Sequence, residues 1–177
     1  MRFGVNAGGD NRVKEGDLPE MPLGVLDILL HLLAFAGTVG IVVYVAMAYP
    51  QLPEYVPMHF GINGEADSWA ARSSVWFLVA TGVFCYVLTA GCSFFPKAFN
   101  MPVEITPENA PRLLTTIRTC LLFIAVQVVA MFGLVAMMVI RTAHDLPITM
   151  VNYSLWGLMA LLLITTFGMV AYCFKAQ

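Results

Sequence analysis

The sequence predicts an all-α integral membrane protein with four transmembrane helices, cytoplasmic N and C termini, and a small extracytoplasmic hairpin between helices 1 and 2. Hydrophobic residues make up 59% of the chain and charged residues only 11%, whereas a soluble domain carries about a quarter charged residues. Four apolar runs are each long enough to cross a bilayer, which takes about 20 residues. Lys and Arg gather in alternate connecting segments, which is typical of a multi-pass membrane protein.

The predicted elements follow one another simply along the chain. Residues 1–22 form a polar tail, which lacks the short apolar core of a signal peptide. Residues 23–177 form one transmembrane domain, with spans at about 23–48, 75–95, 119–140 and 151–174 and an outward loop at 49–74. Each span must be helical, because lipid offers no hydrogen-bond partner to an open backbone. Thr106 as a cap and Pro107 as the first helical residue predict that the third helix begins well before its span.

The orientation follows from the positions of the nine basic residues. Two of them, Arg72 and Arg141, fall in the first and third connecting loops. The other seven fall in the tail, the second loop and the C-terminus: Arg2, Arg12, Lys14, Lys97, Arg112, Arg118 and Lys175. Cytoplasmic segments of membrane proteins carry the excess of Lys and Arg. We therefore expect both termini and the second loop inside, and the 49–74 and 141–150 loops outside.

A few polar residues fall within or next to the apolar spans. Asp27 and His31 lie one turn apart on one face of the first helix, at a depth similar to that of Arg118 on the third. We expect an interfacial ion pair between Asp27 and Arg118 or Arg112. A proton relay through Asp27 and His31 is the alternative.

Gln127 is the only strongly polar residue deep in a span. Thr165 and Thr166 reach the same depth on the fourth helix when residues are counted at about 1.5 Å each. We predict a hydrogen bond from Gln127 to one of these threonines, which would join the third and fourth helices.

The outward loop carries the densest set of polar and turn-forming residues. Alternation at Val56, Met58 and Phe60 predicts a short strand. Asn63-Gly64 predicts a tight turn, because both residue types tolerate positive φ. The chain would then return through Glu65 and Asp67, with Asp67 or Ser68 capping the second helix and Trp69 at the membrane interface.

His59, Glu65 and Asp67 are expected to converge across this hairpin, and His144 and Asp145 stand in the other outward loop. Histidines and carboxylates on one face are a candidate set for a divalent metal. No HExxH or similar helical spacing supports that assignment. The alternatives are that His59 and Asp67 stabilise the hairpin or recognise a partner directly.

The run LPEYVPMHFGINGEADSWAARS resembles the bacterial membrane domain of unknown function numbered 1648. The pattern of that family is Pro-x-His-x-x-x-x-Gly-x-x-Asp, which Pro57, His59, Gly64 and Asp67 match, with Asn63 before the glycine. A later run, FNMPVEITPENA, is similar to the cytoplasmic loop of longer members. The resemblance implies a helix, a loop and a second helix, and it points to no particular enzyme activity. Its best-known members are immunity proteins against a secreted toxin, which also signal by holding a repressor at the membrane.

The leading hypothesis is a non-enzymatic protein of the bacterial cytoplasmic (inner) membrane. Its outward loop would act in recognition, immunity or envelope-stress signalling, with a peptide or protein partner at the outer face. One alternative is a membrane enzyme or metal-binding protein that uses His59 and Asp67, and another is an accessory subunit of a membrane complex or transporter. A net charge of −2 gives no reason to expect a nucleic-acid partner. The lipid bilayer is the expected partner, no cofactor is indicated, and the oligomeric state is open.

Overall fold

The computed structural model describes residues 22–95, 103, 105, 106 and 108–175. Within this part the chain forms four long helices and one β-hairpin, and the helices are α1 (Val25–Ala48), α2 (Val75–Cys92), α3 (Ala110–Ala143) and α4 (Thr149–Lys175). All four are long and apolar enough to cross a membrane. The predicted all-α class with four helices long enough to span a membrane is thereby confirmed. α3 begins before its predicted span, as expected, and the other helix ends lie within a few residues of the predicted spans. The polar tail up to residue 21, Lys97 and Pro107 lie outside the described residues.

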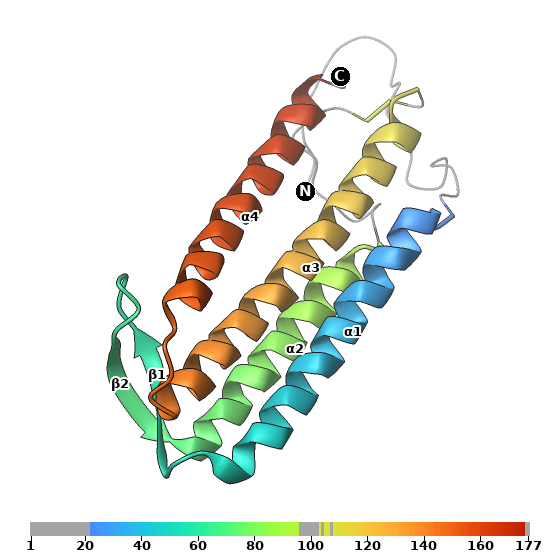
Figure 1. The fold of residues 1–177 in the computed structure, drawn as a ribbon. Coiled ribbons are helices and arrows are strands. Elements are labelled where there is room, and N and C mark those ends of the chain that lie inside the picture. Colours follow the sequence, from blue (N-terminus) through green and yellow to red (C-terminus); the bar gives the residue numbers. More distant parts are fainter. Residues whose placement is uncertain (1–21, 96–102, 104, 107, 176–177) are drawn as a thin grey trace, which may run out of the picture.

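The helices run up and down beside one another, with the hairpin at one end (Figure 1). α1 begins and α4 ends at the opposite end of the bundle. α3 is the central element, because α1, α2 and α4 each pack mainly against it. In the most apolar stretch of α3, 39% of the residues are buried, against 6% in α4. α4 is therefore a peripheral helix that exposes most of its apolar surface.

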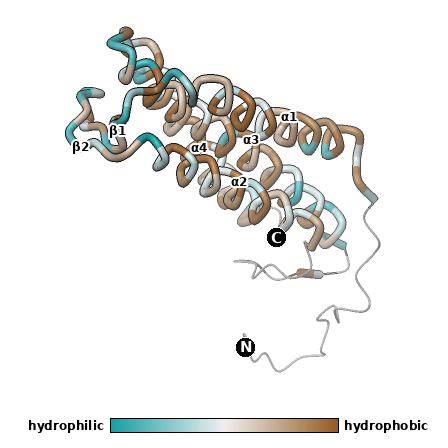
Figure 2. Tube along the Cα trace, turned by 90° about the horizontal axis from the view of Figure 1, so that it is seen from below, coloured by the Kyte–Doolittle hydropathy of each residue, from teal (hydrophilic) through white to brown (hydrophobic). Residues whose placement is uncertain are grey.

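Two clusters of buried hydrophobic residues hold the ends of the bundle. The cluster beside the hairpin joins Val45 of α1, Val75 of α2 and Val139 of α3 to Val56 of the hairpin. The cluster at the other end joins Leu113 and Ile117 of α3 to Cys173 of α4. Figure 2 shows hydrophobic residues along the helices and hydrophilic ones concentrated at the hairpin and the helix ends. The hairpin is thus part of a packed core and not a free loop.

The start of α2 corrects one prediction. Neither Asp67 nor Ser68 caps this helix, because both lie in a β-strand, Ala66–Ala71. A short 3-10 turn, Arg72–Ser74, follows the strand, and α2 begins at Val75 with no side-chain cap. Asp67 and Ser68 therefore lie in the second strand of the hairpin, although their capping propensity had predicted them at the start of α2.

The start of α3 agrees with expectation in its main feature. The backbone N–H of Asn109 donates to the Thr106 hydroxyl at 3.3 Å, and the N–H of Thr106 donates to the Asn109 side chain at 2.9 Å. These bonds are reciprocal, as in a capping box, but they lie just before the helix. α3 begins at Ala110, with Asn109 as its N-cap residue and no side-chain cap hydrogen bond. The helix thus begins nine residues or so before its predicted span, as expected, although Thr106 is not its N-cap.

Candidate functional site

The hairpin consists of two antiparallel strands, β1 (Tyr55–Phe60) and β2 (Ala66–Ala71). The register pairs Pro57 with Trp69, His59 with Ser68, and Phe60 with Ala66, with irregularities on either side of His59. The last two pairs leave Asp67 as an extra residue on β2. Such a bulge re-aims a side chain and is common next to functional sites.

The turn of the hairpin is built by the predicted Asn63-Gly64 pair. Gly64 has φ of +84°, a conformation that glycine adopts without steric cost. The N–H of Gly61 donates to the Glu65 carbonyl at 2.8 Å, and the N–H of Gly64 donates to the Gly61 carbonyl at 2.9 Å. The Glu65 N–H donates to the Asn63 side-chain oxygen at 3.3 Å. Asn63 and Gly64 are thus explained by the geometry of the turn.

His59 and Asp67 form the polar centre of the hairpin. Nδ1 of His59 lies 2.5 Å from Oδ1 of Asp67, and the two side chains are 70% and 55% exposed. The bulge at Asp67 turns its carboxylate to the histidine across the hairpin. Pro57, one of the motif residues, is fully buried, whereas Trp69, its partner across the strands, is 52% exposed. The structure therefore brings His59 and Asp67 together at the surface of an anchored hairpin.

The outer-loop residues expected to join this pair have other surroundings. His144 follows α3 directly, and its Nδ1 donates to the Ile140 carbonyl at 2.8 Å. Asp145 has φ of +55° in the turn that follows. Within the described residues no three His, Cys, Asp or Glu side chains gather as a metal site. Of the residues considered for a metal, His59 and Asp67 come together, and among the described residues Glu65, His144 and Asp145 do not join them in a group of three.

A second polar cluster lies at the other end of the bundle. Nε of Arg118 lies 3.3 Å from Oδ2 of Asp27, and the two side chains are 5% and 3% exposed. The Thr119 hydroxyl donates to Oδ1 of Asp27 at 2.7 Å, and the Gly24 N–H donates to Oδ2 at 3.1 Å. Arg118 also donates to the Pro22 carbonyl at 3.2 Å. The predicted ion pair between α1 and α3 is present, and both oxygens of the Asp27 carboxylate accept a hydrogen bond.

His31 extends this cluster to α2. Its Nε2 lies 3.2 Å from the hydroxyl of Ser93, which is fully buried and donates to the Ala90 carbonyl at 2.6 Å. Because the single hydroxyl proton goes to that carbonyl, Nε2 of His31 must be the donor to Ser93. The ring also stacks on Phe94, with 4.8 Å between ring centres. Ser93 and Thr119 were missed from the sequence, because small hydroxyl residues near span ends are too common to signal a contact.

Gln127 forms the predicted link between α3 and α4. Its Nε2 donates to the Thr165 hydroxyl at 3.0 Å, and that hydroxyl donates to the Leu161 carbonyl of its own helix. The Thr166 hydroxyl donates to Leu162 instead. Gln127 therefore hydrogen-bonds only Thr165 of the two threonines, and this bond joins α3 to α4 at mid-span.

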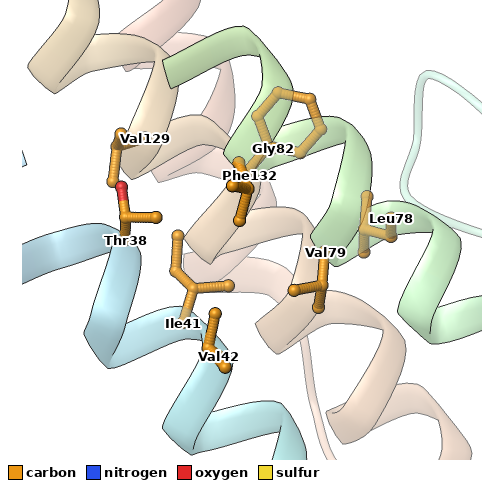
Figure 3. A pocket seen from close by; sticks show the side chains of 9 residues that line it. Thr38, Ile41, Val42, Leu78, Val79, Gly82, Val129 and Phe132 are labelled. Carbon is orange, nitrogen blue, oxygen red and sulfur yellow. The ribbon is translucent and has the colours of Figure 1, made fainter. Parts of the chain in front are cut away.

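An apolar crevice opens between α1 and α2, with α3 as its floor (Figure 3). Thr38 is the only lining residue with a polar side chain, and its hydroxyl already donates to Ala34 at 2.8 Å. Gly82 lies against the ring of Phe132 at the floor. The crevice offers packing space but no free polar group for chemistry.

Four spanning helices and an anchored hairpin define a multi-pass membrane protein. Residues 36–83 match the family model described as "Domain of unknown function (DUF1648)", so the chain carries this domain in that segment. The match runs from within α1, through the hairpin, into α2, so the hairpin is its centre. No curated protein and no solved structure matches the chain.

Proposed function

We propose that the protein is a non-enzymatic component of the bacterial inner membrane whose hairpin is an outward-facing recognition surface. The partner is a peptide or protein at the outer face, and the role is immunity or envelope-stress signalling. The distribution of basic residues supports this orientation, because it assigns Arg72 and Arg141 to the outer segments and the other seven to the inner ones.

One observation carries the proposal: the His59–Asp67 pair is exposed although the hairpin that bears it is anchored. Val56 is fully buried in the core shared by α1, α2 and α3, so the hairpin backbone is fixed. The pair itself stands at 70% and 55% exposure. An exposed ion pair contributes about 0–1 kcal/mol to stability. A rigidly presented polar pair with so little structural role is well suited to contact a partner.

A challenge assay tests this function. We expect cells that lack the protein to become more sensitive to envelope-active peptides, and wild-type protein to restore tolerance. His59→Gln and Asp67→Asn should fail to restore it at normal protein levels, because both disrupt the paired polar centre. Glu54→Gln is the matched control, since Glu54 is an exposed carboxylate just before the same strand. Unchanged sensitivity on removal of the protein would contradict the proposal.

A further inference from the structure

We propose that the hairpin turn, residues 61–65, lies at the hydrocarbon boundary of the bilayer and that Ile62 contacts lipid there. The partner of this surface is the lipid leaflet on the hairpin's side of the membrane. The inference does not depend on which side that is, nor on the recognition function proposed above.

The turn packs directly on the first turns of α4. A Cβ atom on Gly64 would lie 3.1 Å from Nδ2 of Asn152 and 3.5 Å from Cδ1 of Ile148. Gly64 is itself buried, so glycine serves both the positive φ and this close approach. The turn therefore lies beside a membrane-spanning helix and does not extend away from the bundle.

The contact with Gly64 buries the polar side chain of Asn152. Asn152 is one of only two buried residues on α4 within the described chain, on a helix that exposes most of its surface away from α3. A side-chain amide left facing hydrocarbon costs several kcal/mol or so. The Gly64 backbone packs against the Asn152 amide, which keeps this polar group from facing lipid on the outer side of α4.

The depth of the contact follows from the length of α3. The buried Asp27–Arg118 pair marks one end of the apolar region, and the hairpin core packs on Val139 and Ile140 at the other. The roughly 22 residues from Arg118 to Ile140 span about 33 Å at about 1.5 Å per residue. The hydrocarbon core of a bilayer is about 30 Å thick. The hairpin core, and the turn beside it, therefore lie at the second boundary.

The apolar side chains around the turn fit this depth. Ile62 is 82% exposed, and Met150 and Tyr153 on the adjoining turns of α4 are 78% and 67% exposed. Exposed apolar surface that continues from a spanning helix is explained by lipid, and Tyr is enriched at membrane interfaces. Glu65 is exposed as well, which places the turn at the boundary and not deep in hydrocarbon.

A nitroxide label at position 62 tests the inference in nanodiscs of a single phosphatidylcholine. Cys85, Cys92, Cys120 and Cys173 are replaced by Ala, and Ile62→Cys is compared with Ser68→Cys, an exposed site on β2 of the same hairpin. We expect the ratio of accessibility to oxygen over accessibility to a water-soluble nickel chelate to be several-fold higher at 62 than at 68. Equal ratios, both favouring the nickel chelate, would overturn the inference.

A second measurement uses the native sequence and needs no cysteine replacement. The Ile62 methyl signal is followed in isotope-labelled wild-type protein in the same nanodiscs. We expect strong broadening by a nitroxide attached to the lipid headgroup and little broadening by a gadolinium chelate in water. The reverse order would overturn the inference, and neither outcome bears on the challenge assay.

Discussion

Among the described residues, two acid–base pairs of opposite character lie at the two ends of the bundle. Asp27 and Arg118 are 3% and 5% exposed, and their pair is enclosed by further donors from Thr119 and Gly24. His59 and Asp67 are 70% and 55% exposed and stand on the hairpin surface. The first pair joins α1 to α3, whereas the second joins two strands that are already hydrogen-bonded to each other.

The difference in burial between the two pairs indicates which of them the fold depends on. Removal of one partner from a buried pair leaves an uncompensated charge and costs about 3–5 kcal/mol, whereas an exposed pair contributes about 0–1 kcal/mol. The Asp27–Arg118 pair is therefore structural. The His59–Asp67 pair is expected to contribute little to folding, which is consistent with the recognition role proposed for it.

The largest expected effect is at the buried pair. Asp27→Ala should lower the free energy of unfolding by about 3–5 kcal/mol, because Arg118 is left charged and buried. Chemical denaturation in mild detergent measures it. Asp27→Leu combined with Arg118→Met is the control, since removal of both charges should recover most of the loss. If Asp27→Ala alone were as stable as wild type, the buried pair would not be the structural one.

The next effect is at the hairpin turn. Gly64→Ala should destabilise the protein by about 1–3 kcal/mol, because the residue keeps positive φ and its Cβ would crowd the Asn152 amide. Gly40→Ala is the matched control, with nothing within 4 Å of the new Cβ. Thermal melting of the two variants in nanodiscs compares them, and equal midpoints would show that the turn does not pack on α4.

A smaller effect is expected between α3 and α4. Gln127→Leu removes the hydrogen bond to Thr165 and should cost about 0.5–2 kcal/mol, the range measured for such contacts in membranes. Thr166→Val controls for it, since the Thr166 hydroxyl bonds only within its own helix. If melting of Gln127→Leu in detergent matches that of wild type, the link contributes nothing to stability.

The sequence predicted the helices well, because the length of an apolar run and the demands of lipid leave few alternatives. It also predicted that Gln127 bonds a threonine of α4 and that Asp27 pairs with an arginine of α3, since depth in a span follows from simple counting. The structure identifies these partners as Thr165 and Arg118. The second strand of the hairpin was predicted less well, because Asp67 was expected to cap α2. It lies instead in a bulge of β2 and caps no helix. Register and bulges depend on cross-strand contacts that local propensity does not contain.

The contact of Gly64 with Asn152 could not be predicted for a similar reason. Asn152 stands near the start of an apolar run, where a polar residue carries no signal of its partner. The tight turn predicted at Asn63-Gly64 already accounted for the glycine, because a turn of this kind requires positive φ. Nothing in the sequence therefore indicated a second role for Gly64. Only the packing of the hairpin on α4 reveals its second role, and that packing joins segments about 90 residues apart.

The smallest effect, and the most direct test of the account, is at the exposed pair. Melting of His59→Ala and Asp67→Ala should be compared with that of Asp27→Ala in the same nanodiscs, and the same variants tested in the challenge assay. The account predicts a loss within about 1 kcal/mol at the exposed pair, together with failure to restore tolerance. Hairpin variants that unfold as easily as Asp27→Ala, or that restore tolerance fully, would contradict it.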